Sequence, residues 1–359
     1  GINVLPHAVR ELDELGLAAD LEAVAVPTAE LVFYSARGQH IWGEPRGREA
    51  GYRWPQLSIH RGRLLGSLYR AVLDRLGPDR VHHGHHLDGF ESRDGKVRAA
   101  FVERASGALR DHVDGALLVG SDGVHSTVRA ALVPDEGPPK WNGITMWRGV
   151  TEAEPFLSGR SMIMAGYFAR RIVAYPISRA QEHGGRALIN WVAEYRGEDG
   201  RPMPLQDWDH RVDIDEVLDI FGSYRFDFCD VPALIRSAEA VYQYPMVDRD
   251  PLDRWTEGRV TLLGDAAHPM YPVGSNGASQ AIIDARVLAR HLALAPDIET
   301  ALASYEAERR PATSAVVLAN REVGPEQCME IVHERAPDGF DDIHDIISAA
   351  ELDAIAEQY

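Results

Sequence analysis

The most informative pattern of apolar and polar positions lies in residues 258–284. Val260, Leu262 and Leu263 form a short apolar run, which predicts a strand that is covered on both faces. A loop follows that contains Pro269, Pro272, Gly274 and Gly277. From Ala278 the apolar positions recur at helical spacing, at Ile282, Ala285, Leu288, Ala289 and Leu292. This stretch therefore predicts a strand, a loop and a helix whose amino terminus faces the loop.

Gly264 and Asp265 follow the predicted strand, at the edge where ligands bind in open α/β sheets. The glycines of the loop let the backbone approach a ligand closely. The N–H groups near Asn276, Gly277 and Ala278 could stabilise negative charge on a ring, and Asp265 could accept hydrogen bonds from hydroxyl groups. The alternative is an ordinary turn in which Asp265 is only a turn former.

A second unit of the same kind occupies residues 115–129. A buried strand is predicted for residues 116–119, a tight exit at Gly120, Asp122 and Gly123, and a helix from Ser126. The alternative is that Asp122 only caps this helix, with Arg129 on a solvated face. Two strand-Gly-Asp units in one chain favour a binding role.

The remaining pattern predicts further helices and a second, β-rich region. Helices are expected at residues 6–17 and 63–76, with Arg61 at the start of the latter, and paired strands at residues 30–42 and 91–113. Residues 143–246 predict a mainly antiparallel sheet with aromatic side chains on one face: Trp147, Tyr167, Tyr175, Trp191, Tyr195 and Tyr244. Most of these rings should be core, and some should line a flat cavity. Residues 330–359 predict one covering or subunit-contact helix.

Composition narrows the class of protein. The net charge of −18 and the absence of a Lys/Arg-rich block argue against a nucleic-acid partner. Two distant cysteines, Cys229 and Cys328, suggest no disulfide framework and fit a reducing cytoplasm. No apolar run reaches the ~18 residues that a membrane-spanning helix needs. The histidines at positions 82, 83, 85 and 86 lack acidic partners at ligand spacing, so we expect no metal site.

The stretch GDAAHPMYPVGSNGASQAI resembles the second flavin-binding motif of the class A flavoprotein aromatic hydroxylases, the para-hydroxybenzoate hydroxylase family. Residues 1–17 and 120–129 resemble the same family, and ITMWRGVTE and YPMVDRDPL are most similar to its phenazine hydroxylases, which act on an N-methylated phenazine carboxylate. The resemblance implies a monooxygenase that uses FAD, NADH or NADPH, and O₂. It hydroxylates an aromatic substrate through a flavin C4a-hydroperoxide.

The resemblance also implies site residues. Cofactor contacts are expected at Val4, Leu5, Arg61, Asp122, Gly123, Gly264, Asp265, Pro272, Gly274, Asn276, Gly277 and Ala278. Of these, Pro272, Gly274, Asn276 and Gly277 would lie over the flavin and help its ring to move during catalysis. Substrate-side residues would be Trp147, Arg148, Tyr175, Trp191, Tyr244 and Met246, with Arg148 as the partner of a substrate carboxylate.

The expected fold is α/β: a Rossmann-like FAD-binding domain with an inserted, mainly antiparallel substrate domain and a C-terminal helix. The FAD-binding domain would comprise residues 1–27, 58–136 and 250–324, and the substrate domain residues 28–57 and 137–249, followed by residues 325–359. No G-x-G-x-x-G occurs, so the first βαβ unit is expected to be absent from this chain. Truncation, disorder and true absence remain open. The alternatives are another FAD-dependent oxidoreductase, or a non-catalytic flavin-fold binding protein. NADH or NADPH as reductant, and monomer or homodimer, also remain open.

Overall fold

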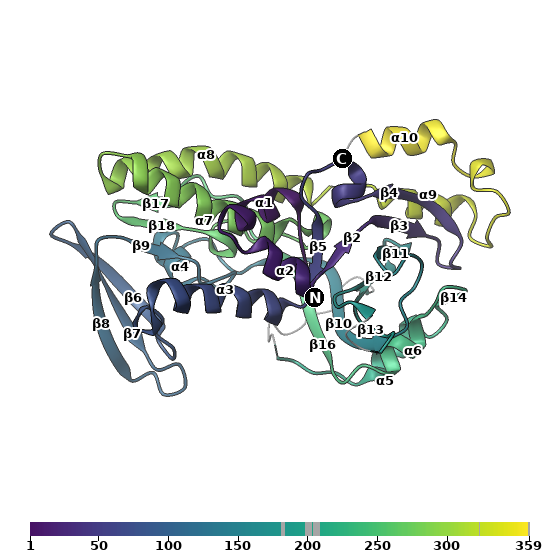
Figure 1. The fold of residues 1–359 in the computed structure, drawn as a ribbon, viewed down its shortest axis with the longest axis horizontal. Helices are drawn as coiled ribbons and strands as arrows, with labels where there is room; N and C mark the ends of the chain where they lie inside the picture. Colours follow the sequence, from purple (N-terminus) through teal and green to yellow (C-terminus); the bar gives the residue numbers. More distant parts are fainter. Residues whose placement is uncertain (181–183, 198–202, 204–208, 323, 358–359) are drawn as a thin grey trace. The chain divides into compact units, whose positions relative to one another are not determined.

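The computed structural model describes residues 1–180, 184–197, 203, 209–322 and 324–357. The chain forms two compact units, each built from separate stretches of sequence (Figure 1). Unit 1 comprises Gly1–Leu65, Trp141–Met246 and Glu322–Tyr359, and unit 2 comprises Gly66–Lys140 and Val247–Arg321. The mixed α/β fold class is confirmed. The residue ranges that we predicted for the two functional domains stay a prediction.

Unit 1 is centred on a seven-stranded sheet with the order β16-β10-β13-β12-β11-β3-β4. Strand β13 pairs antiparallel with β10 and β12, β11 pairs antiparallel with β12, and β3 pairs antiparallel with β4, whereas β11 and β3 are parallel. The strands are β16 (Val241–Asp248), β10 (Lys140–Ala153), β13 (Ala187–Arg196), β12 (Arg170–Pro176), β11 (Ser161–Tyr167), β3 (Glu30–Tyr34) and β4 (His40–Pro45). This sheet is the one that the alternating pattern predicts.

Two helices cover one face of this sheet and build the largest apolar core of unit 1. They are α5 (Ile214–Phe221) and α6 (Val231–Arg236), joined through the short strands β14 (Arg225–Phe226) and β15 (Cys229–Asp230). Both helices have an aspartate at the amino-terminal cap: Asp213 accepts a hydrogen bond from the N–H of Asp215, and Asp230 accepts one from Ala233. Phe221 and Ile235 are fully buried against the sheet.

The amino-terminal part of unit 1 is a small three-stranded sheet with two short helices. The sheet has the order β1-β5-β2, from β1 (Ile2–Val4), β5 (Gln56–Ile59) and β2 (Val26–Thr28). The helices are α1 (Pro6–Glu14) and α2 (Ala18–Val24). Pro6 suits the first turn of α1 because its fixed φ matches the helix and its missing N–H would have no helical partner.

Unit 2 combines a β-meander, a small parallel pairing and long helices. The meander is β6 (His86–Arg93), β7 (Lys96–Val102) and β8 (Leu109–Gly115). The second sheet has the order β17-β18-β9, from β17 (Thr256–Glu257), β18 (Val260–Leu262) and β9 (Leu118–Gly120), with β18 and β9 parallel. The helices are α4 (Thr127–Leu132), α7 (Asn276–Leu294), α8 (Ile298–Ala319) and α3 (Arg61–Leu76), which begins in unit 1.

Two local expectations are wrong. The strand predicted at residues 116–119 is β9, Leu118–Gly120, and its two apolar residues are only half buried. The carboxyl-terminal stretch is two helices, α9 (Gln327–Arg335) and α10 (Ala349–Glu357), rather than one. The break follows from Pro337, which disfavours helical backbone at the preceding residue, and from Gly339, whose φ of 99° no helix contains.

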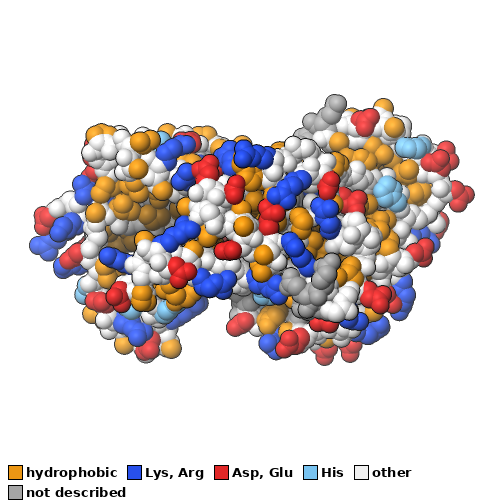
Figure 2. All heavy atoms as spheres, viewed as in Figure 1, with side chains coloured by type: hydrophobic (Ala, Val, Ile, Leu, Met, Phe, Trp, Pro, Cys, Tyr) orange, Lys and Arg blue, Asp and Glu red, His pale blue; other side chains and the backbone are white. Residues whose placement is uncertain are grey.

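The charged surface is mixed. On the face drawn in Figure 2, Asp and Glu side chains alternate with Lys and Arg rather than forming a single basic block. Within the described residues, no helix is long and apolar enough to cross a membrane.

Candidate functional site

The predicted strand, loop and helix of unit 2 are present. Strand β18 is fully buried, as the apolar run predicts, and ends at Leu262, one residue before the end of that run. Gly264 and its neighbours form a short 3₁₀ turn, in which Ala266 is buried and Asp265 is exposed. Gly264 has a φ of 61°, and a Cβ atom there would lie 3.1 Å from the Cβ of Ala281 in α7. Glycine is therefore required both by the backbone conformation and by the close approach of the helix.

Helix α7 begins beside Asp265. Its preceding residue, Ser275, has a left-handed backbone (φ 60°, ψ 28°) and makes no side-chain cap hydrogen bond. A Cβ atom at Gly277 would lie 3.8 Å from Oδ1 of Asp265, which places this carboxylate along the first turn of the helix. A 19-residue helix also carries a partial positive charge at this end.

These features fit the cofactor that the sequence implies. The carboxylate of Asp265 can only accept hydrogen bonds, as hydroxyl groups of a sugar alcohol require. The side chain of Ser275 does not cap the N–H groups of Asn276, Gly277 and Ala278, which can stabilise an electron-rich ring edge. Pro272 and Gly274 are both exposed on the loop, and Gly274 has a φ of 66°. The donor and acceptor set therefore suits FAD.

In the second motif, at residues 115–129, the aspartate accepts hydrogen bonds from the start of its own helix. Oδ1 of Asp122 accepts a hydrogen bond from Oγ of Ser126 at 2.5 Å, and Oδ2 accepts one from the N–H of Thr127 at 2.7 Å. Asp122 therefore caps α4, which is the structural role that the sequence left as an alternative. Gly123, with a φ of 82°, provides the turn into this cap. A nucleotide contact of Asp122 stays a prediction.

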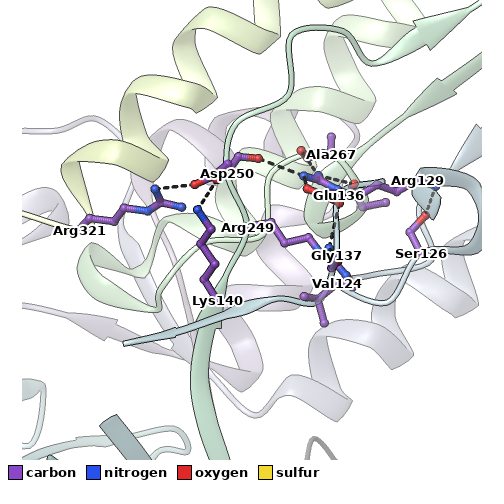
Figure 3. Close-up of polar contacts among 11 residues, drawn as sticks. Val124, Ser126, Arg129, Glu136, Gly137, Lys140, Arg249, Asp250, Ala267 and Arg321 are labelled. Atoms are coloured by element: carbon purple, nitrogen blue, oxygen red, sulfur yellow. Dashed lines mark hydrogen bonds and ion pairs between the residues drawn. The ribbon is translucent and has the colours of Figure 1, made fainter. Parts of the chain in front are cut away.

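Sequence reasoning missed the most connected residue of unit 2, Arg129. We weighed it only as a residue of a solvated helix face, and this is wrong, because it is 1% exposed. Its Nη1 donates to the carbonyl oxygens of Ala266 at 3.0 Å and Ala267 at 2.7 Å, and its Nε donates to Glu136 at 2.8 Å (Figure 3). Arg129 thus ties the helix of the Asp122 motif to the turn of the Asp265 motif.

Glu136 and Asp250 extend this network, as Figure 3 shows. Glu136 also accepts a hydrogen bond from Nη1 of Arg249 at 2.9 Å, and Asp250 pairs with Lys140 and, at 2.9 Å, with Arg321. The sequence signal that could have identified the network is the placement of Ser126 and Arg129 three residues apart, on the buried face of a short helix.

The six predicted substrate-side residues do not share one face of the sheet in unit 1. Trp147 and Trp191 lie on the face that packs against α5 and α6, and Trp191 is completely buried. Arg148 lies directly opposite Val192, and Tyr175 opposite Asn190, so both point to the other face. The expectation of a single aromatic face is therefore wrong. Tyr195, opposite Thr145 and stacked on Trp147, belongs to the core face.

The opposite face gathers a polar cluster around Arg148. The guanidinium of Arg148 lies 5.8 Å from the ring centroid of Tyr244, and its Nη2 donates to Sδ of Met146 at 3.6 Å. Met246 is buried and lies on the same face of β16 as Tyr244, two residues away. The cluster combines a cation, two phenols and thioethers, a set suited to a flat ring that carries an anionic group.

Burial controls the protonation of this cluster. Burial lowers the pKa of the Arg148 guanidinium, and the charge of Arg61 lowers it further. Burial also raises the pKa of Tyr175 to about 12, although the charges of Arg148 and Arg61 oppose this. At neutral pH, Tyr175 is therefore a neutral hydroxyl group. Arg61 itself is the exposed first residue of α3.

The remaining predicted contacts lie at the start of unit 1. Val4 ends strand β1 and is buried, and Leu5 precedes α1, where its carbonyl oxygen accepts hydrogen bonds from Ala8 and Val9 at 3.0 Å. The clustered histidines at positions 82, 83 and 85 lie before β6, and His86 begins that strand. Within the described ranges, no group of three or more His, Cys, Asp or Glu side chains could hold a metal ion.

Comparisons with known proteins show the family of this chain. The sequence model of the FAD binding domain family matches residues 4–320. Phenazine 1,6-dicarboxylic acid hydroxylase PhzS of Lysobacter antibioticus is 46% identical over 329 residues, which is 90% of this chain and 79% of that protein. 3-Hydroxybenzoate 6-hydroxylase 1 of Aquipseudomonas alcaligenes is 31% identical over 333 residues, which is 89% of this chain and 78% of that protein.

Solved structures share the fold. Klebsiella pneumoniae HpxO complexed with FAD and uric acid aligns with a TM-score of 0.74 at 22% identity, over 99% of this chain and 84% of that one. A salicylate hydroxylase substrate complex aligns with a TM-score of 0.73 at 22% identity, over 99% of this chain and 89% of that one. With the family match over most of its length, the chain belongs to the FAD binding domain family and, within it, to the FAD-dependent aromatic hydroxylases, which use NAD(P)H and O₂ on a small aromatic substrate.

Proposed function

We propose that this chain hydroxylates a fused aromatic substrate of the phenazine class that carries a carboxylate. The 46% identity to a phenazine dicarboxylic acid hydroxylase supports the ring system. The observation that supports a carboxylate on the substrate is the lack of a carboxylate partner for Arg148. Among the described residues no carboxylate lies at ion-pair distance from its guanidinium, and its buried Nε has no hydrogen-bond partner. A partly buried cation without a carboxylate partner is costly unless a ligand supplies the anion.

Different residues would bind the cofactor and the substrate. When bound, FAD supplies the redox chemistry by accepting hydride from NAD(P)H and activating O₂. Asp265 would hold its sugar-alcohol chain, and the first turn of α7 would stabilise negative charge on its ring. Arg148 would orient the substrate carboxylate, the neutral hydroxyl of Tyr175 would donate a hydrogen bond to it, and Met146 and Met246 would exclude water from the ring.

The remaining predicted cofactor contacts would have supporting roles. Val4, Leu5, Arg61, Asp122 and Gly123 would contribute to nucleotide and flavin contacts. The loop with Pro272, Gly274, Asn276 and Gly277 would cover the flavin and permit its ring to move. Its φ values above zero at Gly274 and Ser275 support a loop that is built for close backbone approach. We also propose that the enzyme acts in the cytoplasm, as a monomer or homodimer, with NADH or NADPH.

Substitution of Arg148 tests the substrate assignment. In the full-length protein, Arg148→Met should raise the KM for a phenazine carboxylate about 10- to 100-fold, because a hydrogen bond to a charged group contributes about 1.5–3 kcal/mol. The measurement is substrate-stimulated NAD(P)H oxidation together with the amount of hydroxylated product.

A phenazine without a carboxylate is the matched control. The Arg148→Met variant and the parent enzyme should use it equally well, because the lost interaction is absent from both reactions. If Arg148→Met keeps the parent KM for the carboxylated substrate, the role of Arg148 is refuted.

A further inference from the structure

We propose that a buried array of Asp284, His268 and Arg309 is the positioning device that holds Asp265 toward the first turn of α7. The inference rests on the proposed function, because it assigns to Asp265 a role in cofactor binding. The three residues are not among the predicted site residues. They all lie in unit 2, on the turn after β18 and on helices α7 and α8.

Asp284 accepts hydrogen bonds from both ends of the turn that contains Asp265. Its Oδ2 accepts a hydrogen bond from the backbone N–H of Gly264 at 3.1 Å and one from Nε2 of His268 at 2.5 Å. Gly264 and His268 bracket the segment that carries Asp265. Because one carboxylate oxygen accepts from both, the path of the chain between them is fixed relative to α7.

Arg309 supplies the opposite charge. Its Nε donates to Oδ1 of Asp284 at 2.7 Å, and its Nη2 donates to Oε1 of Gln280 at 2.5 Å. Asp284 is completely buried, and His268 and Arg309 are 3% and 7% exposed. With partners on both oxygens, the buried carboxylate is satisfied, and α8 is joined to two positions of α7, residues 280 and 284.

The array has a role beyond the stability of the core. A buried ionic group seldom gains stability over apolar residues of similar volume, so its presence calls for another reason. The segment that it holds contains the left-handed Gly264, which is in close contact with Ala281 of the same helix. Asp284 therefore links the conformation of the turn to the position of α7 along its axis. Through this link, the exposed Asp265 keeps a fixed position relative to the first turn of α7 at Gly277.

The test compares FAD affinity with stability in the full-length holoenzyme and its apoprotein. Asp284→Asn keeps the shape of the side chain but loses the charge and cannot accept both hydrogen bonds with the same oxygen while pairing with Arg309. We expect the Kd for FAD, measured by quenching of flavin fluorescence on titration of the apoprotein, to rise at least tenfold, with a changed visible flavin spectrum.

Tyr305→Phe is the matched control. Tyr305 is buried in the same core, and its hydroxyl donates to the carbonyl oxygen of Leu262 at 3.0 Å, on the same strand but outside the turn. Its loss should lower the Tm while the Kd for FAD stays within twofold. An Asp284→Asn variant whose Kd also stays within twofold, at any change in Tm, would overturn the proposal.

His268 provides a second pair of variants if Asp284→Asn does not fold. Gln can place an amide N–H where Nε2 of His268 lies, so His268→Gln should recover most of the FAD affinity that His268→Ala loses. Equal Kd values for the two variants would reject the array. Asp265→Ala separates this inference from the proposed function: parent-like FAD affinity in that variant refutes the role of Asp265, whereas loss there with normal affinity in Asp284→Asn refutes only the positioning array.

Discussion

At the scale of single residues, two aspartates in similar motifs have different surroundings. Asp265 is exposed beside the first turn of α7, and Asp122 accepts hydrogen bonds from the first turn of α4. The sequence predicts both positions, because each follows an apolar strand and a glycine. It does not predict the buried partners, since Arg129, Asp284 and Arg309 meet residues that are up to 138 positions away in the chain. Only the packed structure brings such groups together.

The pKa of Asp284 leads to a prediction for acid stability. Burial alone would raise its pKa, but the hydrogen bond from His268 and the charge of Arg309 hold it below the ordinary value of 3.8. A carboxyl group with a lowered folded pKa contributes stability above its unfolded pKa and loses it as pH falls through the folded value. The difference in urea stability between the parent and Asp284→Asn should therefore shrink as pH falls below about 4.

Asp248→Asn is the control with the opposite sign. Burial raises the pKa of Asp248 in spite of its ion pair with Arg321. Protonation therefore favours the folded parent, whose stability relative to Asp248→Asn should rise as pH falls through that raised pKa. If the two variants change with pH in the same direction, the protonation states assigned here are wrong.

At the scale of elements, the sheet of unit 1 separates core residues on one face from the residues that we propose contact the substrate on the other. Alternation along β10 and β13 predicts two faces, but the sequence does not reveal which face α5 and α6 cover. The register settles this, because Gly149 lies opposite Trp191, and a Cβ atom there would lie 2.2 Å from its ring. Similarly, the apolar spacing after residue 330 predicts helix, but the break at Pro337 and Gly339 depends on where α9 stops packing on the sheet.

Substitutions of Trp191 test this division of faces. Trp191→Ala should lower the free energy of unfolding by about 3–5 kcal/mol, as expected for removal of a buried aromatic side chain. Trp191→Phe keeps most of the packing and should leave the KM for substrate within twofold of the parent, in contrast to Arg148→Met. Urea unfolding and steady-state kinetics measure both effects. A tenfold change in KM for Trp191→Phe would place this ring at the substrate instead.

At the scale of the whole molecule, the sequence predicts the family and its chemistry more fully than the architecture. The motifs suffice because FAD supplies the redox chemistry, and in the proposed site the protein adds only backbone donors, one carboxylate and an arginine. The boundaries of the compact units are harder to predict from the sequence, because unit 1 consists of three stretches of chain and unit 2 of two. The net charge of −18 argues against a nucleic-acid partner on electrostatic grounds but says nothing about the substrate.

The most direct test of the central claim is product labelling under ¹⁸O₂ with the full-length protein, NAD(P)H and a phenazine carboxylate. An aromatic monooxygenase transfers one atom of O₂ to the ring, so the hydroxylated product should carry ¹⁸O, in proportion to the NAD(P)H consumed. Oxidation of NAD(P)H that yields only hydrogen peroxide, or a product whose new oxygen comes from water, would contradict the account.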